Sequence, residues 1–310
     1  MRYDCIGSGL RQGSCLTKSL PHRRASAPRP TFGLAMGGGG ARGLAHIHVI
    51  ETLDEMGIRP VAIAGSSIGA IMGAGMAAGM TGAEIHDHAR SVLEKPINVA
   101  SRMWSARPTS VKEVLSKGFR LGQFNLERLL KAFLPTQVPM MFEELEVPLS
   151  CTATDYFAHA LSVLDSGDLN SALAASAAIP GVFRPVKRDG RLYVDGGFYN
   201  PLPFDLLEGK ADIVIAVDVV GSPVEGPKPP TTVDLMYGAS QLMMQSIIAA
   251  QLKHHRPPHI LVKPDISRFR VLDFLKIDAV LKETVSVRDE LKRDIENAVR
   301  DFDRNASKRQ

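Results

Sequence analysis

A chain of 310 residues with 45% hydrophobic and 23% charged residues has the size and composition of one large domain or two modest domains of a soluble protein. It holds no run of about 18 consecutive apolar residues, so the sequence argues against an integral membrane protein. Three cysteines with no CxxC pair predict a reducing, cytoplasmic location and neither a disulfide scaffold nor a structural zinc site.

The formal net charge of +4 originates in the first 30 residues, where six basic residues face a single acid. This segment is rich in Ser, Pro, Gly and Arg and lacks the apolar core of a secretory signal. We therefore predict a disordered basic tail over residues 1–30, with an organelle presequence or an overlong start as alternatives. The remaining residues are nearly neutral, which gives no reason to expect nucleic-acid binding.

From residue 31 short apolar strands alternate with glycine turns and helices. The strands are expected at 31–36 and 61–64, and each is followed by a glycine turn and a helix, the first to about residue 56 and the second to about residue 78. Two such units in succession predict a parallel sheet with crossover helices.

Residues 82–145 are irregular and mostly helical, and we predict that they form a helical insertion. Beyond them we expect strands at 148–155, 160–164, 192–194, 212–220 and 259–262, and helices at 171–178, 232–253 and 277–302. The prediction is a single α/β domain over residues 31–310, with a mainly parallel central sheet and helices on both faces.

The run Gly38–Gly43 satisfies GxGxxG between a strand and a helix, which is the fingerprint of dinucleotide binding. That fingerprint also needs an acid at the end of the next strand, and this strand ends in Gly65-Ser66-Ser67. A phosphate loop would need a closing Gly-Lys-Ser/Thr, which is absent. A glycine turn of this kind also offers backbone N–H groups to a phosphate or to a developing oxyanion. Arg42 opposes the helix dipole there, so we expect a functional or ion-paired side chain rather than a solvated one.

The segment Gly65-Ser66-Ser67-Ile68-Gly69 fits GxSxG between a strand and a helix, which is the setting of a nucleophile elbow. Such a turn exposes Ser67 Oγ at the end of the strand, and Gly65 and Gly69 relieve the crowding around it. We predict that Ser67 is a nucleophile; a packing turn with an inert serine is the alternative.

The best candidate base is Asp195. It follows a predicted strand, and Gly196 and Gly197 leave room for its carboxylate to approach another group closely. The histidines that follow Ser67 in the sequence do not lie in a glycine-flanked loop after a strand, as the base of an α/β-hydrolase does. Asp155, at the end of another predicted strand, is the fallback.

Four motifs in this order resemble those of the patatin-like phospholipases, and they are GGGxRG at Gly38–Gly43, GxSxG at Gly65–Gly69, ASxxxP at 175–180 and DGG at 195–197. The likeness spans about residues 32–220, weakens to about residue 300 and excludes the tail. Gly37 stands where plant members carry an acid, so the chain is more similar to the bacterial-type members. The resemblance implies a three-layer patatin-like architecture.

It also implies a dyad without histidine, in which Ser67 attacks an ester carbonyl and Asp195 takes its proton. Backbone N–H groups of Gly38, Gly39 and Gly40 would hold the oxyanion with help from Arg42, while Ser176 and Pro180 would shape the wall behind the dyad. A free carboxylate of pKa about 4 is a weak base towards serine, so burial should raise the pKa of Asp195. The expected activity is hydrolysis of phospholipids, lysophospholipids or other lipid esters, with no cofactor and no metal.

The other candidate clusters favour structural roles. His46-x-His48 and His86-x-His88 have a spacing that points the rings apart on a helix, so we do not expect metal binding at either pair, and we expect His46 to be packed or hydrogen-bonded. Met72, Met76 and Met80 recur every four residues, which predicts core packing, with an acyl-pocket lining as the alternative. We expect residues 82–145 and this methionine helix to form the substrate pocket.

Two other classes of function stay open, namely a non-catalytic regulatory or binding protein that retains the motifs and a nucleotide-binding oxidoreductase. The expected partner is a lipid or other acyl-ester substrate. Peripheral contact of the basic tail with an anionic membrane is a second interpretation of the charge. Because the charges are spread over 30 residues rather than clustered, we expect a dispensable tail.

Overall fold

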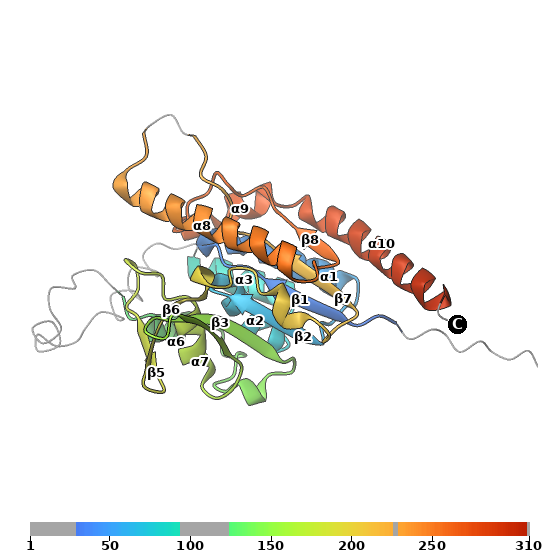
Figure 1. Ribbon diagram of the computed structural model, residues 1–310, viewed down its shortest axis with the longest axis horizontal. Helices are drawn as coiled ribbons and strands as arrows, with labels where there is room; N and C mark the ends of the chain where they lie inside the picture. The colour runs from blue at the N-terminus through green and yellow to red at the C-terminus, as the bar shows by residue number, and fades with distance from the viewer. Residues whose placement is uncertain (1–28, 94–123, 226–228, 309–310) are drawn as a thin grey trace, which may run out of the picture.

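The computed structural model describes residues 29–93, 124–225 and 229–308 (Figure 1). Its centre is an eight-stranded sheet with the order β5-β6-β3-β2-β1-β7-β8, in which β4 also pairs with β3. The mutually parallel strands are β1 (Phe32–Met36), β2 (Ala62–Ser66), β3 (Leu149–Asp155), β7 (Ile213–Val217) and β8 (Ile260–Val262). Two strands run antiparallel to β3, namely β4 (Ala160–Leu164) and β6 (Arg191–Asp195), and β5 (Val186–Arg188) pairs antiparallel with β6. The predicted mainly parallel α/β sheet is confirmed, with β5 as a strand that the sequence did not predict.

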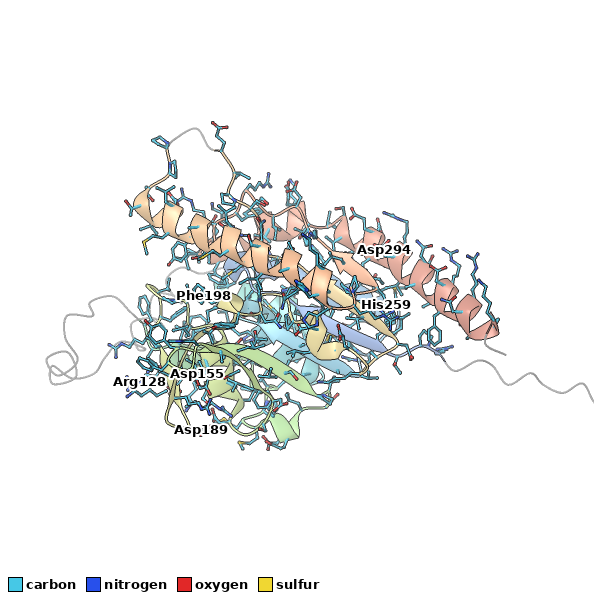
Figure 2. All side chains as sticks on the ribbon, in the orientation of Figure 1. Arg128, Asp155, Asp189, Phe198, His259 and Asp294 are labelled. Carbon is cyan, nitrogen blue, oxygen red and sulfur yellow. The ribbon has the colours of Figure 1, made fainter. Side chains whose placement is uncertain are left out.

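Helices cover both faces of the sheet because alternate strand residues point in opposite directions. Leu34 and Met36 of β1 pack in one apolar cluster with the helices α1 (His46–Glu55), α2 (Ile68–Ala77), α9 (Ile277–Glu283) and α10 (Val287–Lys308). Ala35, between them, packs in a second cluster with the 3-10 turn η4 (Phe204–Leu207) and with α8 (Thr232–His254), which lies along the outside of the body (Figure 2). The second face is built mostly of alanine on β1 and β2, so its covering elements approach closely.

The remaining helices are α3 (Gly82–Leu93), α6 (Leu126–Phe133) and α7 (Leu169–Ser176), and the remaining 3-10 turns are η1 (Gly40–Ala45), η2 (Phe142–Glu144), η3 (Gly196–Phe198) and η5 (Phe274–Lys276). In the predicted insertion the described parts are helical (α3, α6 and η2), and residues 94–123 lie outside the described residues. Residues 1–28, which hold nearly all of the predicted basic tail, lie outside them as well. In the described part of the chain, no helix is both long and apolar enough to cross a bilayer.

Local sequence signals set the helix ends. Gly57 lies two residues after the last residue of α1 and has a φ of 65°, as is common for a glycine that ends a helix. Asp168 accepts a hydrogen bond from Ser171 N at 2.6 Å, so α7 begins two residues earlier than predicted. At the start of α8, Thr231 and Asp234 form a reciprocal capping box.

The strand registers explain how distant parts of the sequence meet. Along most of its length, β3 has β4 on one of its edges. On its other edge, Thr152 pairs with Ser66 at the end of β2, and the next residue, Ala153, pairs with Asp195 at the end of β6. Strands β2 and β6 therefore meet end to end along β3, and Ser67 follows Ser66 at their junction.

Candidate active site

Ser67 lies in a strained turn between β2 and α2. Its φ of 53° and ψ of −123° fall in a region of backbone space that residues with a side chain rarely adopt. The turn is tight enough to exclude side chains beside it, because a Cβ on Gly65 would lie 2.5 Å from Ala70 Cα and one on Gly69 would lie 2.1 Å from Met36 O. This is the geometry of a nucleophile elbow, which places the serine at the N-terminus of a helix.

The Ser67 hydroxyl donates a hydrogen bond to Asp195, with 2.7 Å between Oγ and Oδ2. The other carboxylate oxygen, Oδ1, accepts a hydrogen bond from Gly197 N at 2.8 Å. Asp195 is 2% exposed, and this burial raises its pKa from 3.8 to about 6, although the hydrogen bonds from Ser67 and Gly197 act in the opposite direction. The carboxyl group is thus still mostly ionised at pH 7, and it is a stronger base than an exposed aspartate.

The predicted support residue Ser176 holds the backbone of the elbow. Its Oγ accepts a hydrogen bond from Ser67 N at 2.9 Å. Two residues further on, Ala178 O accepts a hydrogen bond from Asp195 N at 3.1 Å, and Thr154 Oγ1 donates to Asp195 O at 2.8 Å. The last residue of α7 and the segment that follows it therefore hold the main chain of Ser67 and Asp195.

The glycine turn after β1 offers fewer free amides than the sequence suggested. Gly38 N–H donates to Pro201 O at 2.9 Å, so the prediction that it binds an oxyanion is corrected: this donor is already satisfied. Among the described residues, none accepts a hydrogen bond from the N–H groups of Gly39 and Gly40, and both residues line the same cavity as Ser67. A Cβ on Gly39 would lie 2.0 Å from Val219 O, so only glycine fits there.

Arg42, in η1, is 2% exposed, which contradicts the interpretation as a solvated arginine. Burial lowers its pKa from 12.5 to about 10, partly countered by Asp273, so the guanidinium remains charged at pH 7. Its Nε and Nη1 have no hydrogen-bond partner among the described residues, and the side chain lines the cavity beside Ser67. A buried and unpaired cation is suited to stabilising negative charge that forms nearby. Gly43 follows, and its lack of a side chain lets η1 pack against Ile68 of α2.

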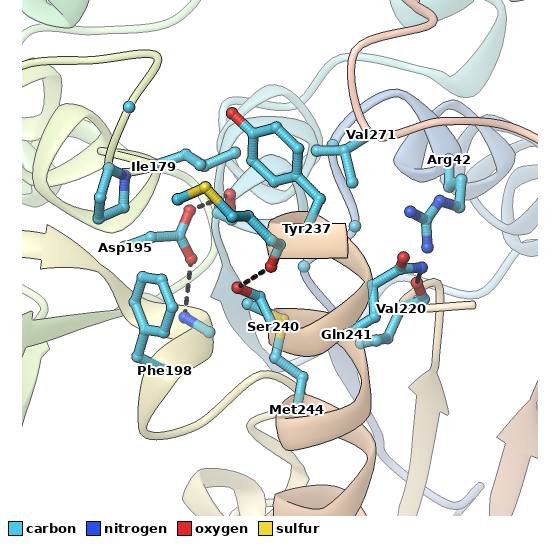
Figure 3. Close-up of a pocket in the computed structure, with 18 of the residues that line it drawn as sticks. Arg42, Ile179, Asp195, Phe198, Val220, Tyr237, Ser240, Gln241, Met244 and Val271 are labelled. Carbon is cyan, nitrogen blue, oxygen red and sulfur yellow. Dashed lines mark hydrogen bonds between the residues drawn. The ribbon is translucent and has the colours of Figure 1, made fainter. Parts of the chain in front are cut away.

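A cavity of about 320 Å³ opens beside the dyad (Figure 3). Most of its lining is apolar, and one wall is the helix α8. That wall carries Val233, Met236, Tyr237, Ser240, Gln241 and Met244, and other parts of the lining come from Ile179, Pro180, Gly181, Phe198, Val220 and Val271. An apolar cavity with a few convergent polar groups is the usual form of a small-molecule site.

Of the two elements expected to form this cavity, the described parts of residues 82–145 do not line it, and residues 94–123 lie outside the described residues. Met72, Met76 and Met80 are buried in the core, as the favoured interpretation predicted, and they do not line the cavity. The wall comes instead from α8, which the sequence analysis placed as a helix without a role. A signal was present, because the stretch Leu235–Leu252 contains no charged residue.

The fallback base does not belong to this site. Asp155 pairs with Arg191, at 3.0 Å between Oδ2 and Nη1, and its Oδ1 accepts a hydrogen bond from Ala158 N. These contacts hold its pKa below the usual range, and the residue does not line the cavity. Asp155 is therefore corrected to a structural residue at the end of β3.

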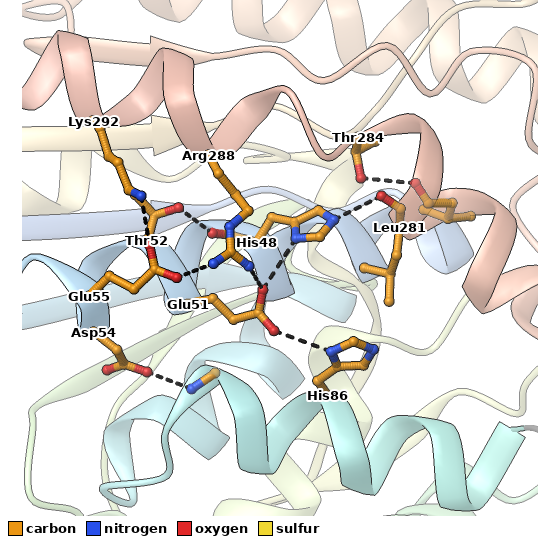
Figure 4. A network of polar contacts seen from close by, with 12 residues as sticks. His48, Glu51, Thr52, Asp54, Glu55, His86, Leu281, Thr284, Arg288 and Lys292 are labelled. Atoms are coloured by element: carbon orange, nitrogen blue, oxygen red, sulfur yellow. Dashed lines mark hydrogen bonds and ion pairs between the residues drawn. The ribbon is translucent and has the colours of Figure 1, made fainter.

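The four singled-out histidines are hydrogen-bonded, as predicted for His46. Three of them donate to main-chain carbonyls through Nε2: His46 to Gly37 O at 3.0 Å, His48 to Leu281 O at 2.8 Å, and His88 to Phe133 O at 2.6 Å. His48 and His86 each contact a different carboxylate oxygen of Glu51 through Nδ1 (Figure 4). In the described ranges, no group of three or more His, Cys, Asp or Glu residues is arranged to hold a metal ion.

The same network ties the two ends of the fold together (Figure 4). Arg288 of α10 pairs with Glu51 and Glu55 of α1, and Lys292 Nζ lies 2.7 Å from Glu55 Oε2. The C-terminal helix is thus part of the body that carries the dyad.

Comparison with known proteins places these features in a family. The sequence model of the patatin-like phospholipases matches residues 34–208. An uncharacterised NTE family protein of Mycobacterium tuberculosis is 38% identical over 205 residues, which cover 66% of this chain and 52% of that protein. Patatin-like phospholipase domain-containing protein 6 of Homo sapiens is 32% identical over 199 residues, covering 61% of this chain and 13% of that protein.

Lysophospholipase NTE1 of Coccidioides immitis is 27% identical over 281 residues, covering 81% of this chain and 17% of that protein. Among solved structures, VipD from Legionella pneumophila matches with a TM-score of 0.43 and 15% identity, covering 85% of this chain and 67% of that one. The chain spans about half the length of the mycobacterial relative. The family match covers more than half of the chain and includes Ser67, Asp195 and the glycine turn, so the chain belongs to the patatin-like phospholipase family.

Proposed function

We propose that this protein hydrolyses acyl esters of lipids through a dyad of Ser67 and Asp195. The observation that carries the proposal is the 2.7 Å hydrogen bond from Ser67 Oγ to a buried carboxylate, beside an apolar cavity. Membership of the patatin-like phospholipases and the similarity to a protein named as a lysophospholipase support a lipid ester as the substrate class.

In the proposed reaction, Asp195 Oδ2 accepts the proton of Ser67 as Oγ bonds to the carbonyl carbon of the ester. The carbonyl π electrons move to the oxygen, and the free N–H groups of Gly39 and Gly40, together with the charge of Arg42, stabilise the resulting oxyanion. When this intermediate collapses, the alcohol leaves with the proton from Asp195 and the acyl group stays on Ser67. A water molecule then attacks the acyl-enzyme and gives its proton to Asp195. When this second intermediate collapses, the bond from the acyl carbon to Ser67 Oγ breaks, Ser67 takes the proton back from Asp195, and the fatty acid is released.

The environment of the dyad suits this chemistry. A general base works best when its pKa lies near the operating pH, and burial raises the pKa of Asp195 to about 6. The elbow presents Ser67 at the N-terminus of α2, where the helix dipole favours developing negative charge. The donors of Gly39 and Gly40 need no rearrangement before they bind an oxyanion.

A series of p-nitrophenyl esters of increasing acyl length tests the proposal. We expect Ser67→Ala and Asp195→Asn each to lower kcat/KM by at least about 10³-fold. Ser66→Ala is the matched control, because the neighbouring hydroxyl is buried, has no hydrogen-bond partner among the described residues and does not line the cavity. Its turnover should stay close to that of the wild type. Unchanged turnover in the Ser67 variant would overturn the assignment.

A further inference from the structure

Helix α8 presents an apolar face to the outside of the molecule. Five of its apolar side chains, Val233 and four residues further along, are each more than half exposed, and the exposed Ala239 lies at a matching helical position between them. We call the latter four and Ala239 the outer stripe, which consists of Leu235, Met236, Ala239, Leu242 and Met243. These positions recur at intervals of three and four residues, so they lie on one side of the helix.

The side of the same helix that faces the body carries both polar and apolar residues. Gln241 Nε2 donates to Val220 O at 3.1 Å, Gln245 Nε2 donates to Gly221 O at 2.7 Å, and Ile248 packs in the second apolar cluster. A surface helix normally keeps its outer side polar, whereas the outer side of α8 carries the apolar outer stripe. A continuous apolar surface that stays exposed marks an interaction site.

The outer stripe continues into the cavity beside the dyad. Met236 is 67% exposed and also lines the cavity, and Val233, nearly one turn earlier, is 59% exposed and lines it as well. Their neighbour Tyr237 lines the cavity too (Figure 3). Apolar surface therefore runs from the outside of α8 to the space next to Ser67.

We infer that the outer stripe docks on a lipid surface and that the ester enters the cavity directly from that surface. The inference rests on the proposed function, since it concerns how the same site receives a lipid. A second copy of the chain packed on the stripe would cover Met236 and Val233 and so obstruct the cavity. A lipid surface in the same position would instead supply the substrate there.

The charges along α8 agree with a position in the plane of the interface. No charged residue occurs between Asp234 and Lys253, and the helix ends at the exposed residue His254, which is followed by the exposed residues His255 and Arg256. An apolar face next to basic groups at one end matches an apolar layer under anionic headgroups. The helix is not apolar enough to cross the bilayer, so it would lie on the surface.

The test uses the variant Leu235→Ser/Leu242→Ser/Met243→Ser. These side chains belong to the stripe, are each more than half exposed and do not line the cavity, so the catalytic site should be unaffected. The matched control is Val61→Ser/Met140→Ser/Val285→Ser, which changes three apolar residues of 42%, 58% and 55% exposure away from α8. Both are compared with the wild type for binding to vesicles of phosphatidylcholine and phosphatidylglycerol and for hydrolysis of soluble p-nitrophenyl butyrate.

We expect the stripe variant to bind the vesicles at least about tenfold more weakly, because each substitution removes apolar area from the contact. The control should bind like the wild type, and all three proteins should hydrolyse the soluble ester within about twofold of each other. Equal vesicle binding by the stripe variant and the control overturns the inference. So does a wild-type protein that dimerises through the stripe and ignores vesicles.

Vesicle binding and ester turnover are measured separately, so this inference and the proposed function can fail independently, and the Ser67→Ala variant should still bind vesicles. If the wild type binds vesicles but hydrolyses no ester, the proposed function is wrong and the docking surface stands. If the wild type hydrolyses the soluble ester but does not bind vesicles, the docking surface is wrong and the proposed function stands.

Discussion

Replacing Asp195 with Asn should lower activity and raise stability at neutral pH. Burial raises the pKa of this carboxyl group from 3.8 to about 6. At about 1.4 kcal/mol per pKa unit, the ionised side chain is therefore roughly 3 kcal/mol less stable in the fold than in the unfolded chain. An asparagine avoids this cost, and its side-chain oxygen can still accept the hydrogen bond of Gly197 N while its NH₂ group contacts Ser67 Oγ.

The dependence on pH follows from proton binding. The folded-state pKa lies above the unfolded value, so between pH 3.8 and about 6 the unfolded chain binds fewer protons and stability falls as pH rises. The stabilising contribution of the protonated group is fully present below pH 3.8 and is lost above about pH 6. The gain in stability of Asp195→Asn should therefore reach at most about 3 kcal/mol near pH 7 and disappear near pH 4.

Urea denaturation of the wild type and Asp195→Asn at both pH values measures this gap. For a domain of this size, a gain of that order raises Tm by several degrees, at roughly 2–4 °C per kcal/mol. Turnover of a soluble ester at pH 7 should fall by about 10³-fold in the same variant. The reasoning is refuted if Asp195→Asn is less stable than the wild type at pH 7, or if the gap is the same at both pH values.

Three further predictions concern the supports of the site and the ends of the chain. Ser176→Ala removes the acceptor of Ser67 N, so kcat should fall roughly 10- to 100-fold with little change in KM, and steady-state kinetics on a soluble ester would measure this. Arg288→Ala separates α10 from Glu51 and Glu55, so urea denaturation should show a loss of about 1 kcal/mol with kcat unchanged; equal stability would mean that the exposed pairs contribute nothing. Deleting residues 1–30 should leave kcat on a soluble ester within about twofold, and loss of turnover would show that the fold begins earlier than residue 31.

The dyad was predictable because its signals are local. A serine flanked by Gly65 and Gly69 between a strand and a helix specifies a tight turn, and the structure shows the crowding that requires those glycines. Asp195 was predictable as a candidate because it lies at the end of a predicted strand and is followed by two glycines. That the two side chains meet was expected only from the family resemblance, because their contact depends on β2 and β6 sharing one edge of β3, and strand pairing between distant segments leaves no trace in a single sequence.

The incorrect predictions for Gly38 and Asp155 both depend on contacts with residues far away in the sequence. The amide of Gly38 is satisfied by Pro201 O, an acceptor supplied by a distant loop. Asp155 ends a strand just as Asp195 does, but it lies two residues beyond Ala153 in β3 and is held by Arg191.

The role of helix α8 as a wall of the cavity was missed for a different reason. Gln241 and Gln245 face the body together with the apolar Ile248, while the apolar outer stripe faces outward. Periodicity in a sequence shows that a helix has two sides, but it does not show which side is buried. Only the packed structure identifies this helix as a wall of the cavity.

Covalent labelling of Ser67 tests the central claim most directly. A fluorophosphonate reacts with a serine whose hydroxyl is activated by a base. The dyad predicts that mass spectrometry of the digested protein finds the label on Ser67 and not on the adjacent Ser66, and that Asp195→Asn slows labelling by a factor similar to its loss of turnover. No labelling of Ser67, or an unchanged labelling rate in Asp195→Asn, would contradict the dyad.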